Sequence, residues 1–437
     1  MIYNPLLISL SISMQKVSVI GLGYVGLPLA LAIEKSKKYE VVGYDISEKQ
    51  VKKILNKQCP ITDEVAQKDL EELDLHATTD EKEIKGSDYY IICVPTPVLD
   101  DYTPDYTPVI SAGKTIAKYL EKGQTVILES TVNPGTCEEI LQPILEEGSG
   151  LKAGKDFNIA MCPERINPGD PKWNVYNIPR NLGSLIPEKT KEVADFYRSF
   201  LDAEVNEVSS LKIAEATKIV ENAFRDINIA YVNELAKSFD AMGIDLIETL
   251  KGSSNKPFSF MAHWPGRGVG GHCIAVDPYY LIKRAAESGF DHKLLKMARE
   301  VNNSMPEYTV ERLQDVLNEV KLAINGTKIA LLGLSYKEDI ADLRESPCLE
   351  IKDILEKMGA DLLVYDPFVP DMSNVKSLEE ALDKADGVVV ATAHKSFGDL
   401  TKEISKRKNI KVVVDGMNKL DKKEIEKVGI IYRGIGK

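Results

Sequence analysis

The sequence predicts an α/β protein in which two doubly wound domains are joined by a long central helix. Three observations lead to this prediction: a glycine-rich strand–turn–helix–strand pattern near the start, a stretch over residues 209–242 without glycine or proline, and further strand–loop–helix patterns after Glu307. The length of 437 residues fits two or three domains. We expect domains over residues 1–205, 206–310 and 311–437.

The first pattern, "KVSVIGLGYVGLPLALAIEKSKKYEVVGYDI", reads as a βαβ unit. Gly21, Gly23 and Gly26 form GxGxxG between strand and helix, where backbone N–H groups can hold a pyrophosphate. Asp45 ends the next strand, where its carboxylate would bind the adenosine ribose and repel a 2′-phosphate. The sequence therefore predicts a Rossmann-like domain that binds NAD. The alternative is a glycine turn that only packs helix against sheet.

Residues 209–242 are expected to form the central helix. Lys218, Asn222 and Arg225 lie at separations of four and three, so their side chains can converge on one site. Lys218 is either a partly desolvated acid–base group or a lysine whose stem packs while its ammonium reaches solvent or a carboxylate. A different stripe carries apolar residues at helical spacing, namely Ile213, Val220, Phe224, Ile227 and Tyr231.

The C-terminal pattern begins with "TKIALLGLSYK", which lacks the full glycine fingerprint. A second complete dinucleotide site is therefore not expected there. Lys337 and Arg344 provide cations that could bind a phosphate or a neighbouring carboxylate. A solvated charged loop is the alternative.

One cysteine, Cys273, stands among four glycines in "GRGVGGHCIAVDP". It could be a metal ligand, a structural thiol or a nucleophile. A metal is disfavoured because adjacent residues seldom share one ion, and His272 is expected to pack rather than act as a base. As a nucleophile, Cys273 would attack a carbonyl that the dinucleotide site produces by oxidation. That combination suggests an alcohol oxidised past the aldehyde.

Composition limits the partners. The formal net charge of -12 argues against nucleic acid. Six scattered cysteines indicate reduced thiols and a cytoplasmic protein. We find no apolar run of membrane-spanning length, and the first thirteen residues lack the basic region of a signal peptide, so Met14 could be the natural start.

Together, these motifs resemble the UDP-glucose/GDP-mannose dehydrogenase family from about Gln15 onward. The matching segments are "GLGYVGLPLA", "CVPTP", "LESTVNPGT", "PERINPGD", "EATKIVENAFRDINIAYVNE", "GVGGHCIAVDP" and "SYKEDIADLRESP". The resemblance implies an NAD-dependent, four-electron oxidation of a sugar C6 alcohol to a carboxylate. Cys273 would capture the aldehyde as a thiohemiacetal, and a second oxidation would give a thioester for water to cleave.

The resemblance also implies roles for single residues. Lys218 and Asp277 would handle protons and the developing oxyanion, supported by Asn222. Glu164 of "PER" would be the acid–base residue for thioester hydrolysis, and Thr131 of "EST" would hold its water. The residues expected at the cofactor are Gly21, Gly23, Tyr24, Val25, Gly26, Asp45, Thr96, Ser130, Thr131 and Arg344. Those expected at the substrate are Glu164, Arg165, Lys218, Asn222, Gly270 and Lys337.

By the same resemblance, the first domain binds NAD, the last binds the UDP moiety, and the central helix builds a homodimer. The glycines would let sugar and nicotinamide crowd against the Cys273 thiol. His272 and Val276 replace the serine and lysine of UDP-glucose dehydrogenases, which favours a UDP-N-acetylhexosamine, UDP-GlcNAc or UDP-ManNAc, for surface polysaccharide or glycan synthesis. UDP-glucose, UDP-GalNAc and GDP-mannose remain alternatives, as do a single-oxidation hydroxyacid dehydrogenase and an NAD-binding redox sensor.

Overall fold

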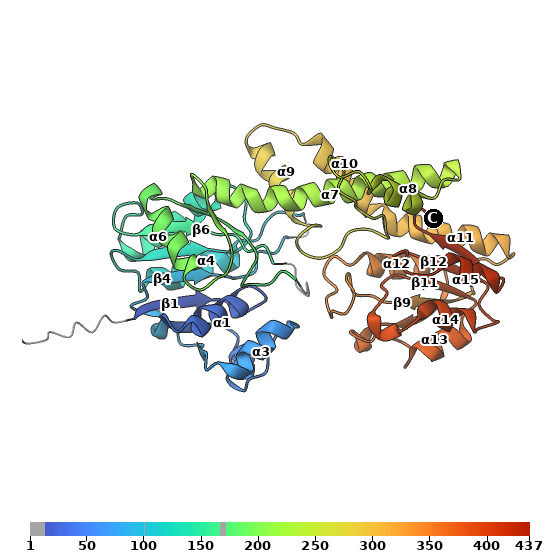
Figure 1. Ribbon diagram of the computed structural model, residues 1–437, viewed down its shortest axis with the longest axis horizontal. Helices are drawn as coiled ribbons and strands as arrows, with labels where there is room; N and C mark the ends of the chain where they lie inside the picture. Colours follow the sequence, from blue (N-terminus) through green and yellow to red (C-terminus); the bar gives the residue numbers. More distant parts are fainter. Residues whose placement is uncertain (1–13, 100, 167–171) are drawn as a thin grey trace, which may run out of the picture. The chain divides into compact units, whose positions relative to one another are not determined.

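The computed structural model describes residues 14–99, 101–166 and 172–437. The first thirteen residues and the last four residues of the "PERINPGD" motif lie outside them. The chain divides into two compact units, one up to Val220 and one from Glu221 onward (Figure 1). Among the described residues, none of the helices has both the length and the apolar composition needed to cross a bilayer.

The first unit is built on an eight-stranded sheet of order β3-β2-β1-β4-β5-β6-β7-β8. Strands β1 to β6 run parallel, β7 is antiparallel to β6, and β8 is parallel to β7. The order of the first six strands is that of dinucleotide-binding sheets. The strands are β1 (Gln15–Ile20), β2 (Tyr39–Tyr44), β3 (His76–Thr78), β4 (Tyr89–Ile92), β5 (Thr125–Leu128), β6 (Asn158–Met161), β7 (Arg180–Ser184) and β8 (Val205–Glu207).

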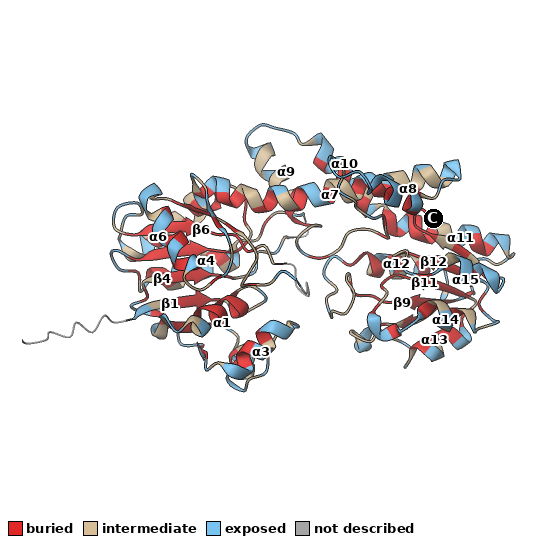
Figure 2. Cartoon of the chain, in the orientation of Figure 1, coloured by how far each residue is buried: buried red, intermediate tan, exposed pale blue. Residues whose placement is uncertain are grey.

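Helices cover both faces of this sheet, so its central strands are apolar on both sides. In β4, Ile91 enters one apolar core while Tyr90 and Ile92 enter the other. The whole of β4 is buried (Figure 2). The helices are α1 (Gly26–Ser36), α2 (Glu48–Leu55), α3 (Glu64–Glu72), α4 (Thr107–Ala117), α5 (Gln142–Ser149) and α6 (Pro187–Arg198), with short turns η1 (Glu81–Ile84) and η2 (Cys137–Leu141).

The second unit contains a five-stranded, fully parallel sheet of order β10-β9-β11-β12-β13. This is the other common order of doubly wound sheets. Its strands are β9 (Lys328–Leu332), β10 (Asp361–Tyr365), β11 (Gly387–Val390), β12 (Val412–Asp415) and β13 (Ile431–Gly434). Its helices are α8 (Leu246–Ser253), α9 (Asp277–Glu287), α10 (Lys293–Asn303), α11 (Met305–Glu319), α12 (Pro347–Lys357), α13 (Leu378–Lys384), α14 (Leu400–Ser405) and α15 (Lys422–Lys427), with turns η3 (Pro370–Met372) and η4 (Lys395–Phe397).

The predicted long helix is present as α7 (Leu211–Met242), which crosses the boundary between the units. Lys218 and Asn222 are buried on it, but Arg225 is exposed, so the prediction that Arg225 joins them is wrong. Asp226 takes the buried position instead, because its carboxylate binds Arg299 Nη1 at 2.7 Å. The buried face therefore follows steps of four residues.

The apolar stripe of α7 is largely exposed. Ile213 and Val220, in the first unit, expose 45% and 57% of their surface. Phe224 and Tyr231, in the second, expose 46% and 55%. Apolar side chains therefore lie on the exposed side of α7 as well as on its buried side, where Leu211, Ile219 and Val232 pack. An exposed apolar stripe of this kind is unusual on the surface of a monomer.

Candidate active site

The glycine turn after β1 is packed tightly at two of its three glycines. Gly21 adopts φ +93°, and a Cβ there would lie 2.9 Å from the Cys93 carbonyl oxygen. A Cβ on Gly26 would lie 1.8 Å from the Gly21 carbonyl oxygen. At Gly23, by contrast, no described atom lies within 4 Å of the added Cβ. The turn is therefore closed against the sheet and open at Gly23, where a phosphate can approach the backbone.

Asp45 lies beside this turn at the end of β2. Its Oδ2 accepts a hydrogen bond from the Leu22 N–H at 2.8 Å, and its Oδ1 accepts one from the Ser47 N–H at 2.8 Å. The Gln50 Nε2 also donates to Oδ2 at 3.5 Å, whereas Oδ1 keeps a further lone pair that can accept a ribose hydroxyl. Tyr24 and Val25 belong to the same turn. Tyr24 is exposed, and Val25 occupies the N-cap position of α1. These residues fit NAD.

Three predicted cofactor residues follow β4 and β5, at the same carboxyl edge of the sheet. The Thr96 hydroxyl donates to the Thr131 carbonyl at 2.7 Å, and the Ser130 hydroxyl donates to the Val94 carbonyl at 2.7 Å. These bonds tie the two loops together. The crevice outside the carboxyl ends of parallel strands is the usual place for a ligand in such sheets.

Glu164, after β6, belongs to a buried polar network. Its Oε1 accepts hydrogen bonds from the N–H groups of Arg165 and Ile166 at 2.6 and 2.8 Å. Its Oε2 accepts one from Arg180 Nη2 at 2.5 Å. The Arg165 side chain donates to the Pro179 carbonyl at 3.0 Å. Glu164 is therefore held as an acceptor by three donors.

The rest of this network was not predicted from the sequence. Arg180 Nη1 donates to Glu129 Oε2 at 2.9 Å, and the Tyr197 hydroxyl donates to Glu129 Oε1. A signal was available: Glu129 directly follows the apolar run "TVIL", and Arg180 opens the buried strand "RNLGS". Charged residues in such positions require buried partners.

In the second unit, two predicted residues come together. The Asn222 Nδ2 donates to Asp277 Oδ2 at 2.5 Å, and both side chains are buried. Asp277 begins α9, and its N–H donates to the Cys273 carbonyl at 2.8 Å. Cys273 is half-buried one turn before the helix. Lys218 lies in the first unit, buried on α7 four residues before Asn222.

His272 differs from expectation. It is exposed rather than packed, and its Nε2 lies 3.5 Å from Cys273 Sγ. The two neighbouring side chains converge because the segment forms a turn after Gly271, which adopts φ +83°. Asp342 raises the pKa of the Arg344 guanidinium by hydrogen bonding, burial opposes this rise, and the charges of Asp342, Tyr336 and Cys273 add to it.

The glycines before Cys273 pack closely against the protein itself. A Cβ on Gly270 would lie 2.7 Å from both the Glu345 carbonyl oxygen and the Tyr336 Cβ, and one on Gly271 would lie 2.7 Å from the Tyr336 ring. These glycines make room for the protein's own segment after β9. Lys337 lies half-buried in that segment.

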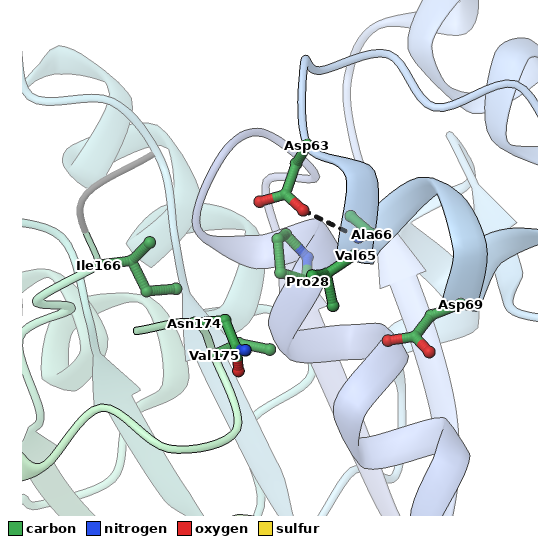
Figure 3. Close-up of a pocket in the computed structure, with 8 residues that line it drawn as sticks. All are labelled: Pro28, Asp63, Val65, Ala66, Asp69, Ile166, Asn174 and Val175. Carbon is green, nitrogen blue, oxygen red and sulfur yellow. Dashed lines mark hydrogen bonds between the residues drawn. The ribbon is translucent and has the colours of Figure 1, made fainter. Parts of the chain in front are cut away.

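A small hollow beside α3 contains none of the predicted site residues. Figure 3 shows its lining residues, Pro28, Asp63, Val65, Ala66, Asp69, Ile166, Asn174 and Val175. Asp63 accepts from the Ala66 N–H at 2.9 Å, and Asp69 binds Lys35 Nζ and the Tyr176 hydroxyl, each at 2.5 Å. Its carboxylates are therefore already bound by protein groups. In the described ranges, histidine, cysteine and acidic side chains do not cluster as a metal site would require.

Family models match along the chain. The NAD binding domain of the UDP-glucose/GDP-mannose dehydrogenase family matches residues 15–201, its central domain residues 212–304, and its UDP binding domain residues 330–422. The chain belongs to this family. The predictions of the family, the α/β fold and NAD as cofactor are confirmed.

Relatives in the UDP-glucose/GDP-mannose dehydrogenase family are similar over nearly the whole chain. UDP-N-acetyl-D-glucosamine 6-dehydrogenase of Pseudomonas aeruginosa is 38% identical, covering 89% of this chain and 92% of the relative. UDP-N-acetyl-D-mannosamine dehydrogenase of Pyrococcus horikoshii is 37% identical, covering 97% and 99%. A solved structure of UDP-D-ManNAc dehydrogenase from Pyrococcus horikoshii aligns with a TM-score of 0.90 at 34% identity, covering 97% of this chain and 99% of that one.

Proposed function

We propose that the protein oxidises the C6 alcohol of UDP-GlcNAc or UDP-ManNAc to the carboxylate and so supplies a nucleotide uronic acid for surface polysaccharide or glycan synthesis. The observation that carries this proposal is the likeness, over nearly the full chain, to relatives that are named for these two sugars. NAD, when bound, accepts the hydride in each of the two oxidations. The glycine turn and Asp45 hold its pyrophosphate and ribose.

Cys273 is the nucleophile in this scheme. Its thiol adds to the C6 aldehyde to form a thiohemiacetal, which the second oxidation converts to a thioester. Asp277 lies one turn further along the chain, and Asn222 fixes its carboxylate. Asp277 and Lys218 together handle the protons and the oxyanion that develop at the C6 oxygen. His272 lies beside the thiol, with its Nε2 at 3.5 Å from Sγ.

Glu164 acts in the hydrolytic step. It accepts a proton from water while the water oxygen bonds to the thioester carbon and Cys273 leaves as the thiolate. Thr131 holds that water. Thr96, Ser130 and Arg344 lie near the cofactor, whereas Arg165, Gly270 and Lys337 contribute to the substrate side.

The substrate is tested with UDP-GlcNAc, UDP-ManNAc, UDP-GalNAc and UDP-glucose. A pocket that pairs the 2-acetamido group leaves polar groups unsatisfied when a 2-hydroxyl sugar binds. We expect kcat/KM for an N-acetylated sugar to exceed that for UDP-glucose by roughly a hundredfold, with about two NADH released per sugar. Faster turnover of UDP-glucose would reassign the substrate, and one NADH per sugar would contradict the four-electron scheme.

Cys273→Ala provides the matched control. It removes the nucleophile and leaves the first unit unchanged. NAD binding should persist, whereas acid production should fall by several orders of magnitude, as is common when a covalent catalytic group is lost. Near-normal acid production would make Cys273 structural.

We also propose that the enzyme is a cytoplasmic homodimer formed through α7. The exposed apolar side chains Ile213, Val220, Phe224 and Tyr231 support this assembly, because a contiguous apolar stripe on a helix favours burial against a partner. Sedimentation equilibrium measures the assembled mass directly, and a monomer at micromolar concentration would refute it.

A further inference from the structure

Glu129 and Arg180 lie next to Glu164 in the interior of the first unit. Arg180 is fully buried, Glu129 is 1% exposed and Glu164 is 5% exposed. The guanidinium bridges the two carboxylates, with Nη1 at 2.9 Å from Glu129 Oε2 and Nη2 at 2.5 Å from Glu164 Oε2. The three charged groups therefore act as one unit.

The sheet topology produces this arrangement. Glu129 and Glu164 follow the parallel strands β5 and β6, so both carboxylates lie at the same edge of the sheet. The next strand, β7, is antiparallel to β6, so its first residue, Arg180, lies at that edge too. The main chains are also joined there, since the Glu164 N–H donates to the Glu129 carbonyl at 3.2 Å.

The two carboxylates have different environments. Glu164 accepts hydrogen bonds from two backbone N–H groups in addition to Arg180. Glu129 accepts from Arg180 and from the Tyr197 hydroxyl, and its other ionisable neighbours are Glu164, Cys93 and Cys162. Burial raises the pKa of Glu129 to about 7, with the charge of Glu164 adding to the rise and Arg180 and Tyr197 opposing it. Burial raises the pKa of Cys162 to about 12, so that thiol stays neutral.

We propose that Glu129 and Arg180 are positioning residues that fix the orientation of the Glu164 carboxylate and set its basicity in the hydrolytic step. This inference rests on the proposed function of Glu164. Arg180 holds Oε2 in place and leaves one lone pair on that oxygen for the water proton. When Glu129 is protonated, Arg180 acts on Glu164 alone and weakens it as a base.

When Glu129 loses its proton, the effect of the network on Glu164 as a base is reversed. A second negative charge then lies beside the same guanidinium, and like charges that share one site each raise the proton affinity of the other. Glu164 becomes a stronger base, and proton transfer from water becomes faster. The hydrolytic rate should therefore rise through pH 7, the range in which Glu129 titrates.

The test is a single-turnover measurement of acid release between pH 6 and 8.5, with enzyme and NAD in excess over the N-acetylated sugar. For the wild type, the rate of acid release should show an inflection near pH 7. Glu129→Gln, which is isosteric with the protonated acid, should lose the inflection and stay at the low-pH rate, about tenfold below wild type at pH 8. The first NADH forms before hydrolysis, so Glu129→Gln should release it at the wild-type rate.

Tyr197→Phe is the second variant, and it leaves all three charges in place. It removes a hydrogen bond that favours ionised Glu129, so the inflection should move to higher pH. A purely structural role would slow acid release equally at every pH. The proposal is overturned if the inflection is absent from the wild type, survives unchanged in Glu129→Gln, or does not move in Tyr197→Phe. If the wild type releases no acid from any of the sugars, the proposed function fails and this inference fails with it.

Discussion

In both units, the first strand of the parallel part of the sheet is followed by a glycine turn. The contacts made by the rest of the turn differ between the two units. In the first unit, Gly21 follows β1 and its N–H donates to the Tyr44 carbonyl at 2.8 Å. In the second, Gly333 follows β9 and its N–H donates to the Tyr365 carbonyl at 2.9 Å. Both glycines adopt positive φ, +93° and +84°. Each turn is thus bent in the same way against the neighbouring strand.

The aspartates that end the second strands also correspond. Asp45 accepts from the Leu22 N–H at 2.8 Å, and Asp366 accepts from the Leu334 N–H at 2.7 Å. However, Gly23 of the first turn is replaced by Ser335 in the second. The Ser335 N–H and hydroxyl both donate to Asp366, at 2.9 and 3.1 Å.

His394 completes the enclosure of Asp366. Its Nδ1 accepts from the Asp339 N–H at 2.9 Å, so Nε2 carries the proton and donates to Asp366 at 3.1 Å. Burial opposes ionisation of Asp366, but the bonds from His394 and the backbone hold its pKa well below its usual range. The second turn therefore differs from the first at two glycine positions, Gly23 and Gly26, which Ser335 and Glu338 replace, and its aspartate accepts additional bonds from Ser335 and His394.

The largest difference between the turns should appear when each aspartate is removed. Asp366→Ala leaves buried donors on Leu334, Ser335 and His394 without an acceptor, and we expect a loss of about 3–5 kcal/mol in the free energy of unfolding. Asp45→Ala, the matched control at the open turn, should cost less than about 1.5 kcal/mol. Denaturant unfolding measures both. Equal losses would show that the two turns are enclosed alike.

The next effect concerns one position where the turns differ. Gly23→Ser places a side chain where the backbone is open, and the new hydroxyl can bind Asp45 as Ser335 binds Asp366. NAD affinity should fall by about 10- to 100-fold, because the pyrophosphate loses its close approach to the backbone. Stability should change by less than about 0.5 kcal/mol. Calorimetric titration gives the affinity, and Ser335→Gly should leave NAD binding unaltered. Unchanged affinity in Gly23→Ser would place the pyrophosphate elsewhere.

The smallest effect is on cofactor choice. Asp45→Ser removes the negative charge that repels a 2′-phosphate while keeping a short polar side chain. The ratio of kcat/KM for NAD to that for NADP should fall by about tenfold. Initial rates with each cofactor provide the measurement. An unaltered ratio would mean that Asp45 does not contact the ribose.

The sequence was sufficient to predict what depends on local pattern. The glycine turn with Asp45 and the long helix α7 follow from spacing along one segment, and the structure contains both. Positions that depend on tertiary partners were not predictable in this way. Asp226, not Arg225, is buried on α7 because Arg299 lies opposite it.

The buried network around Glu164 shows the same limit. Its members Glu129, Glu164, Arg180 and Tyr197 come from four separate segments, and only strand order together with the antiparallel β7 brings them into contact. The packing of the glycines before Cys273 was not predictable for a similar reason. Their neighbour, Tyr336, is more than sixty residues away in sequence, and no spacing rule connects the two segments.

The packing of Gly270 and Gly271 against Tyr336 has a practical consequence for protein engineering. The segment that carries Cys273 packs against the loop after β9, which contains Tyr336 and Arg344. This loop belongs to the domain that the family model assigns to UDP binding. The Gly271 N–H donates to the Arg344 carbonyl at 3.0 Å. Arg267, in the same segment, donates to the Tyr336 carbonyl at 2.9 Å. A chimera designed to exchange nucleotide specificity must therefore transplant the cysteine loop together with the C-terminal sheet. A junction near residue 310 lies between the cysteine loop and the C-terminal sheet in sequence. It would combine the cysteine loop of one protein with the C-terminal sheet of another.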